Sequence, residues 1–109
     1  MNNPRYANGN ARRKVRARLR AEGRDCWICR AFGRPASIDY DLPAGHPMSF
    51  EVDELLPISL GGSPTEYANL DATHRRCNEW RKNKPVPLVL KLAKQARGVG
   101  ASLPQPWEF

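Results

Sequence analysis

Two short motifs with the same internal spacing place the strongest constraint on the fold of this chain. Cys26 and Cys29 form a Cys-x-x-Cys pair in CWIC, and His74 and Cys77 have the same separation in HRRC. A pair with this spacing presents two side chains to one ion, and a second pair completes a tetrahedral zinc site. The spacing therefore predicts one structural zinc ion held by Cys26, Cys29, His74 and Cys77. The competing interpretation is three buried free thiols and an unrelated histidine.

The length of the chain, 109 residues, fits one small domain with a limited core, for which a stabilising metal is a common solution. We predict a disordered segment 1–9, a single domain 10–97 and an extended tail 98–109. No apolar run reaches the length of a membrane span, and the N-terminus lacks the apolar stretch of a signal peptide. We therefore expect a cytoplasmic protein without a disulfide framework.

The charge of the chain, +7 overall, is unevenly distributed. Residues 1–25 carry a net +6 and residues 75–97 a net +7, whereas residues 26–74 carry a net −5. Two basic arms indicate a nucleic-acid partner, and an acidic centre between them indicates a bound cation. A basic structural protein of a ribonucleoprotein would explain the charge but not the ordered Asp53, Asn69 and Asn78.

The pattern of apolar residues and of helix-stop signals predicts an α+β domain. Residues 30–48 are rich in proline and glycine and are expected to be irregular. The expected elements are a helix from Asn10 to Glu22, strands Phe50–Leu55 and Ala68–Thr73, a short helix Asn78–Asn83 and an amphipathic helix from Pro87 to Gly98. The apolar stripe of the last helix, which includes Leu88, Val89, Leu92, Ala93 and Ala96, predicts core packing.

Basic side chains concentrate on the first helix and after the second half of the zinc motif. In nucleic-acid-binding proteins, such side chains neutralise phosphates without reading base sequence. The alternative is a solvated charged helix face. The candidate phosphate contacts are Arg12, Arg16, Arg20, Arg75, Arg76, Arg81, Lys82 and Lys84.

Three segments in one order carry a resemblance to a known family. VDELLPISLGG is followed by NLDATHRRCN and then by RKNK. This combination resembles the HNH endonucleases, in the subgroup that contains a structural zinc, and the resemblance covers roughly residues 10–84. It implies a zinc-stapled ββα-metal fold and cleavage of phosphodiester bonds with one divalent metal, Mg²⁺ or Mn²⁺. Small members of the family come from phages and mobile elements, which implies a role in DNA processing or packaging.

The resemblance assigns roles to four further residues. Asp53 matches the metal-binding aspartate, and Asn78 matches the second ligand of the catalytic metal. Asn69 matches the asparagine that orients the general base. Glu54 stands where the family has its general-base histidine, and this substitution is the departure from the family pattern.

Three roles are open for Glu54. The first is that of a base, although a glutamate, with an ordinary pKa of about 4.3 against about 6.5 for histidine, has less driving force at neutral pH. As a second anionic ligand, it would share the metal with Asp53. In the third case the site binds DNA and no longer cuts it, and a solvent-facing strand residue is the simplest interpretation of Glu54 alone. We predict a metal-dependent endonuclease of low sequence specificity acting on double-stranded DNA; the alternative is a non-catalytic zinc-containing DNA-binding module on the same fold.

Overall fold

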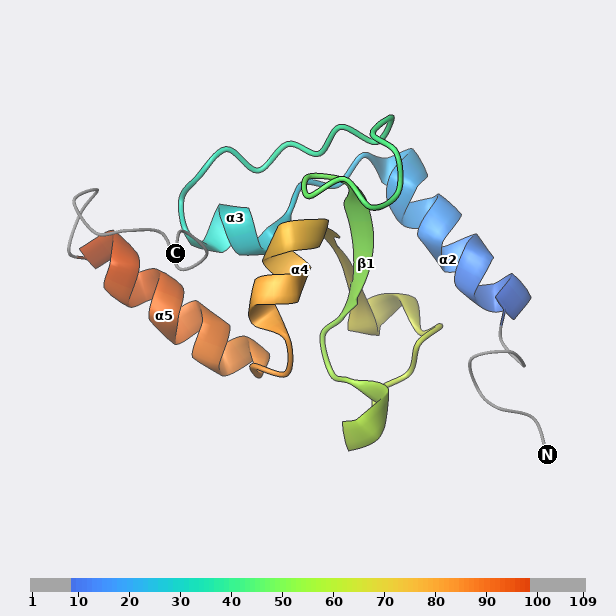
Figure 1. The fold of residues 1–109 in the computed structure, drawn as a ribbon. Coiled ribbons are helices and arrows are strands. Elements are labelled where there is room, and N and C mark those ends of the chain that lie inside the picture. The colour runs from blue at the N-terminus through green and yellow to red at the C-terminus, as the bar shows by residue number, and fades with distance from the viewer. Residues whose placement is uncertain (1–8, 99–109) are drawn as a thin grey trace.

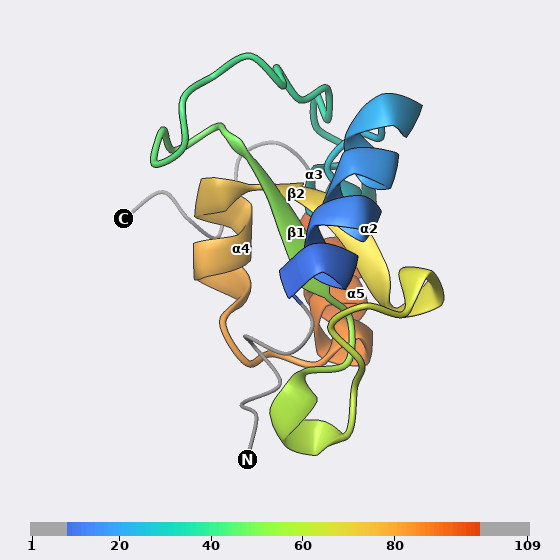
Figure 2. The same cartoon turned by 90° about the vertical axis from the view of Figure 1, so that its right-hand side faces the viewer.

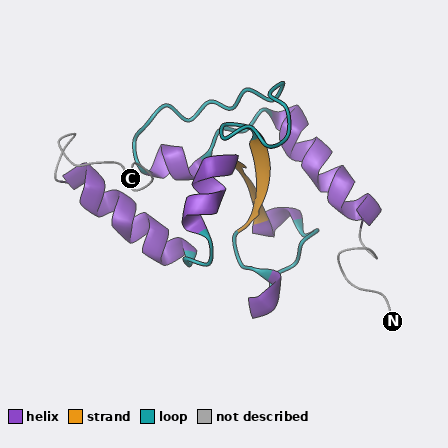
Figure 3. Cartoon of the chain, viewed as in Figure 1, coloured by secondary structure: helices purple, strands orange, loops and turns teal. Residues whose placement is uncertain are grey.

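The computed structural model describes residues 9–98, whose helices surround one small hairpin (Figures 1 and 3). The elements are α2 (Gly9–Glu22), α3 (Trp27–Ala31), β1 (Phe50–Glu54), the 3₁₀ turns η1 (Ile58–Leu60) and η2 (Tyr67–Asn69), β2 (Leu70–His74), α4 (Arg75–Arg81) and α5 (Val86–Gly98). The predicted α+β class is therefore confirmed. The predicted disorder of the N-terminus and the extended C-terminal tail concern residues outside this range.

The hairpin is a two-stranded antiparallel sheet in which Phe50 pairs with His74 and Glu54 pairs with Leu70. Two strands alone are at best marginally stable in water, so the sheet depends on the helices that cover it. Helix α2 lies across one face, where Leu19 packs with Phe50 and Leu70 (Figure 2). Helix α3 contacts β2, and helix α4 contacts both strands. The hairpin therefore lies at the centre of the domain (Figure 1).

A second core cluster joins the two halves of the predicted zinc motif to the last helix. Cys26, Ile28 and Cys77 are fully buried there, together with Val89 of α5. The predicted apolar stripe of α5 is confirmed for Val89 and Ala93. Leu92 and Ala96 are partly buried and pack against the same cluster, whereas Leu88 differs from the prediction because it is 40% exposed.

Most predicted elements lie within a few residues of the observed ones, and one was missed. Helix α2 begins at Gly9 rather than after an Asn10 cap, and it ends as predicted before Gly23, which has a φ of +64°. Helix α4 begins at Arg75, three residues before the predicted start, so Asn78 lies in its middle. Helix α3 has only five residues, too few for a periodic apolar pattern to reveal it.

The loop after β1 folds back on itself and is held by side-chain and backbone contacts. Asn69 donates from Nδ2 to the carbonyls of Leu56 and Ser63, at 2.9 Å each, and its Oδ1 accepts from the Leu56 amide at 2.9 Å. Gly62 lies against the same backbone, since a Cβ on it would lie 1.7 Å from the carbonyl oxygen of Leu56. The second glycine of the Gly-Gly pair is therefore required by close backbone approach.

Gly62→Ala is expected to destabilise the zinc-loaded domain by about 1–3 kcal/mol, because backbone atoms rather than a flexible side chain must move to admit the methyl group. Urea unfolding followed by circular dichroism measures the change. Gly98→Ala is the matched control, since a Cβ at Gly98 meets open space. Equal unfolding midpoints for the two variants would contradict the close approach.

Candidate metal centre and the neighbouring acidic face

Four side chains from three elements meet in one buried group. Cys26 caps α3 and Cys29 lies within it, while His74 ends β2 and Cys77 lies in the first turn of α4. Their ligand atoms lie within 4.8 Å of one another, and all four residues are buried. The sequence prediction that these four residues form one cluster is confirmed.

The distances between ligand atoms in this group match those around a tetrahedrally coordinated ion. Cys29 Sγ lies 3.3 Å from His74 Nδ1 and 3.6 Å from Cys77 Sγ, and Cys77 Sγ lies 3.9 Å from His74 Nδ1. In a zinc site with bonds of about 2.3 Å to sulfur and about 2.0 Å to nitrogen, ligand atoms are about 3.5–3.8 Å apart. The donor set and the distances fit zinc, so the group can hold a zinc ion.

The ring of His74 is oriented for metal binding by a contact on its far side. Its Nε2 lies 2.9 Å from the carbonyl oxygen of Ser37, which can only accept, so Nε2–H donates and Nδ1 faces the cysteines. Metal-binding histidines are commonly held in this way, which fixes the tautomer and the ring orientation. Ser37 belongs to the irregular segment 30–48, so this segment contributes to the candidate metal centre.

Hydrogen bonds among these four side chains shift their pKa values in opposite directions. Hydrogen bonds from Cys29 and Cys77 lower the pKa of the Cys26 thiol, whereas the bonds of Cys77 to Cys26 and Cys29 raise the pKa of Cys77. Hydrogen bonds with Cys26 and Cys29 raise the pKa of His74 to about 10. Since zinc ligands must be deprotonated, a zinc ion bound here would release protons from this group, and its affinity would fall as the pH falls.

A second group of polar side chains lies where β1 faces α4. Asp53 Oδ2 accepts from Arg81 Nη1 at 2.6 Å, and Asn78 Nδ2 donates to Glu51 Oε1 at 3.0 Å. Glu51 and Asp53 are two residues apart on one face of the strand, and Asn78 and Arg81 are three apart on one face of the helix. Three oxygen-bearing side chains, those of Glu51, Asp53 and Asn78, therefore share one interface.

Asp53 is buried, with 5% of its surface exposed, and its charge is compensated. Besides Arg81, the indole Nε1–H of Trp27 donates to the same Oδ2 at 2.8 Å. Burial raises the pKa of Asp53, and the charge and hydrogen bond of Arg81 and the bond from Trp27 act against that rise. A metal ion at Asp53 would have to bind beside an existing ion pair.

Arg81 corrects one sequence prediction. It was expected to contact phosphates, but only 2% of its surface is exposed. Its guanidinium donates to Asp53 and to the carbonyls of Glu54, Leu55 and Lys84 at 2.6–3.1 Å. Arg81 therefore joins α4 to the end of β1 and is not presented to a nucleic acid.

Glu54 lies on the other side of the strand from Asp53. It lines a cavity of about 360 Å³ together with Arg12 and Arg16 of α2, and Glu51 and Val52 also line it. Oε2 of Glu54 and Nε and Nη2 of Arg12 are buried without a hydrogen-bond partner within the described part of the chain. Because β1 is regular through Glu54, the two adjacent acids do not converge on one position, which disfavours the role of Glu54 as a second ligand of an ion at Asp53.

Asn69 was expected to orient the residue at the base position. Its side-chain bonds hold the loop that begins directly after Glu54. The chain's other histidine, His46, is exposed in a turn and its Nδ1 accepts from the Met48 amide.

The remaining candidate phosphate contacts occupy two surfaces. On α2, Arg12 lines the cavity, Arg16 lies with its guanidinium carbon 4.6 Å from the centre of the Phe50 ring, and the exposed Arg20 lies 3.8 Å from Asp41. On and after α4, Arg76 and Lys82 are exposed, Arg75 forms ion pairs with Glu51 and Glu79, and Lys84 donates to the Trp80 carbonyl.

Sequence reasoning missed two residues of these sites. Trp27 lies between the zinc-motif cysteines, and an aromatic residue at that position carries no signal of its own for a contact with a distant carboxylate. Glu51 was missed because the family pattern begins at Val52. The signal that points to Glu51 is strand alternation, which places it on the same face as Asp53.

Comparison of the chain with protein families, with curated proteins and with solved structures found no match. Within residues 9–98, no helix is long and apolar enough to cross a membrane.

Proposed function

We propose that this chain is a metal-dependent endonuclease that hydrolyses phosphodiester bonds of DNA with low sequence specificity. The observation that carries the proposal is the interface of β1 and α4, which gathers Glu51, Asp53 and Asn78 next to the candidate zinc centre. Carboxylate and amide oxygens are the ligands that Mg²⁺ and Mn²⁺ prefer. In this proposal zinc is structural, and Asp53 and Asn78 hold the second ion, with Glu51 beside them.

The second ion supplies the positive charge that stabilises a phosphate under attack. The side chains of this protein bind the phosphate and take up the proton of the attacking water. Arg12 and Arg16 bind the phosphate from the cavity along β1, since the cavity is lined by these two arginines and by Glu54. Glu54, which lines the same cavity, takes the proton from the attacking water. Glu51 lines the same cavity and is bonded to Asn78, so it connects the cavity with the β1–α4 interface.

Further proposed DNA contacts are those of exposed side chains on α2, on α4 and directly after α4. The side chains of Arg20, Arg76 and Lys82 are exposed and suited to contact phosphates, which gives salt-sensitive binding without base readout.

A second function is favoured by one observation. Asp53 already has a cationic partner in Arg81 and a donor in Trp27, as expected of a carboxylate that stabilises the fold. On this account the chain is a zinc-containing DNA-binding module without catalysis.

Plasmid cleavage by zinc-loaded chain separates the two functions. The buffer is freed of divalent ions on a resin, because EDTA would also remove zinc, and Mg²⁺ or Mn²⁺ is then added. The endonuclease proposal expects cleavage only with the added ion, and a loss of about 10²–10⁴-fold for Glu54→Ala if Glu54 is the base. Glu54→His is expected to retain cleavage, since histidine is also a base.

The matched control is Glu66→Ala, which removes an exposed carboxylate distant in sequence from β1. Equal rates for Glu54→Ala and wild type would remove the base role from Glu54. A wild-type chain that binds DNA in a salt-dependent manner but cuts with neither ion would establish the non-catalytic module instead.

A further inference from the structure

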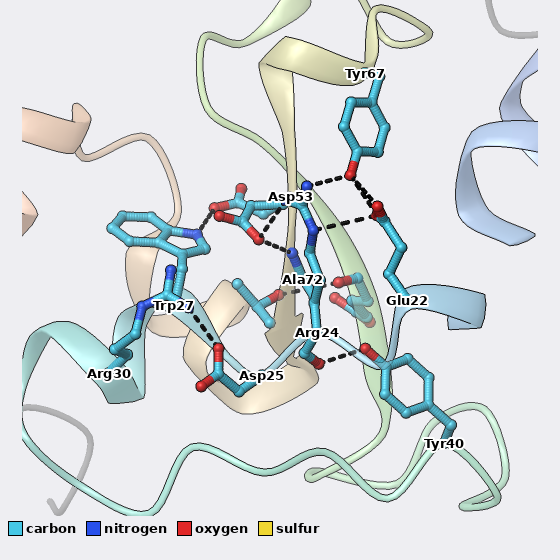
Figure 4. Close-up of polar contacts among 12 residues, drawn as sticks. Glu22, Arg24, Asp25, Trp27, Arg30, Tyr40, Asp53, Tyr67 and Ala72 are labelled. Atoms are coloured by element: carbon cyan, nitrogen blue, oxygen red, sulfur yellow. Dashed lines mark hydrogen bonds and ion pairs between the residues drawn. The ribbon is translucent and has the colours of Figure 1, made fainter. Parts of the chain in front are cut away.

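The tryptophan inside the Cys-x-x-Cys motif joins the two candidate metal sites. Trp27 is flanked by the zinc-motif residues Cys26 and Cys29 along the chain, and its ring is buried, with 6% of the residue exposed. Figure 4 shows its indole pointing at Asp53, to which Nε1–H donates at 2.8 Å. The guanidinium carbon of Arg81 lies 5.5 Å from the centre of the same ring.

The two hydrogen bonds that Asp53 accepts go to the same carboxylate oxygen. Both Trp27 and Arg81 donate to Oδ2, and within the described residues no bond to Oδ1 is formed. Hydrogen bonds of this kind orient a metal-binding carboxylate, in the same way that Ser37 orients His74. Two donors on one oxygen fix the plane of the carboxylate and leave the other oxygen for a further ligand.

We propose that Trp27 is a positioning residue that transmits the order of the zinc centre to Asp53, so that binding of the second divalent ion depends on zinc. This inference rests on the proposed function, in which Asp53 holds that ion. The link between the zinc centre and Asp53 is short. The main chain between Cys26 and Cys29 fixes the position of Trp27, and the indole N–H of Trp27 fixes the orientation of the Asp53 carboxylate. In the zinc-loaded chain, removal of the indole N–H is expected to release the carboxylate from this orientation.

The test is Trp27→Phe, which keeps an aromatic ring in the core and removes the indole N–H. Trp80→Phe is the matched control, since it makes the same change in a tryptophan whose ring packs edge-on against Phe32, with the ring centres 5.6 Å apart. Zinc content, thermal midpoint, Mn²⁺ affinity by electron paramagnetic resonance and plasmid cleavage are measured for wild type and both variants. Trp27→Phe is expected to retain zinc and to lose about 10–100-fold in Mn²⁺ affinity; Trp80→Phe is expected to keep wild-type affinity.

The outcomes are distinguishable. Unchanged Mn²⁺ affinity in Trp27→Phe, with a wild type that cuts, overturns the inference and leaves the endonuclease proposal intact. Loss of zinc in step with loss of Mn²⁺ affinity shows a structural role and also overturns it. A wild type that neither binds Mn²⁺ nor cuts removes the proposed function, and this inference with it.

A measurement on the wild type covers the case in which Trp27→Phe does not fold. In ¹⁵N-labelled, zinc-loaded chain, Mg²⁺ is expected to shift the indole N–H resonance of Trp27 more than that of Trp80. Equal or absent shifts would overturn the inference.

Discussion

Zinc removal is expected to unfold the domain. The candidate zinc ligands join α3, the end of β2 and α4, and together with α5 they form one of the two core clusters. A structural zinc contributes about 10–16 kcal/mol at neutral pH, whereas a domain of this kind has a total stability of about 5–15 kcal/mol. The hairpin cannot replace that contribution, because a two-stranded sheet has little stability of its own.

Circular dichroism during addition of a strong zinc chelator measures this effect, with the chelator presaturated with zinc as the control. Helix and strand signals are expected to collapse with the free chelator and to return when zinc is restored. A chain that keeps its spectrum and its unfolding midpoint after complete loss of zinc would show that the four residues form an ordinary buried cluster.

Arg81→Met is expected to cost about 3–5 kcal/mol of unfolding free energy. The change leaves the buried carboxylate of Asp53 without its cation and three carbonyl groups without their donor. Asp53→Asn leaves the guanidinium unpaired and is expected to cost a similar amount. The double variant is expected to lose less than the sum of the two, because neither charge then remains alone.

Urea unfolding of zinc-loaded variants measures the cycle, and Arg76→Met, an exposed position on the same helix, is the control. Arg81→Met within about 0.5 kcal/mol of wild type would contradict the buried pair. The expected cost also bears on the catalytic tests. Loss of cleavage in an Asp53 variant is evidence for metal binding only when its zinc content and fold are shown to be retained.

The features that could be predicted from the sequence depend on residues that lie close together along the chain. Cys26 and Cys29 are held close by chain connectivity, as are His74 and Cys77, so the zinc group required only that the two pairs meet. A short apolar run and the Gly-Gly pair predicted the first strand and its loop in a similar way. The offset of β2 and α4 by up to three residues arises because β2 passes directly into α4 at His74, without a loop residue to mark the boundary.

The parts that were not predictable depend on contacts between distant segments. An arginine in a basic run is usually solvated, and nothing near Arg81 in the sequence indicates that it bonds to residues 26–28 positions away, at the end of β1 and directly after it. The bond from Trp27 to Asp53 joins residues 26 apart. The separation of Asp53 and Glu54 onto two sides follows from strand alternation, but only once the strand is known to continue through Glu54.

The central claim is that the chain holds two ions of different kinds, a zinc in the cysteine–histidine group and a second divalent ion between β1 and α4. Anomalous diffraction from crystals of zinc-loaded chain soaked in Mn²⁺ tests it most directly, because data at the two absorption edges identify each ion. We predict a zinc peak among Cys26, Cys29, His74 and Cys77 and a manganese peak between Asp53 and Asn78. A zinc peak alone, with Asp53 still paired to Arg81, would contradict the endonuclease account and favour the non-catalytic module.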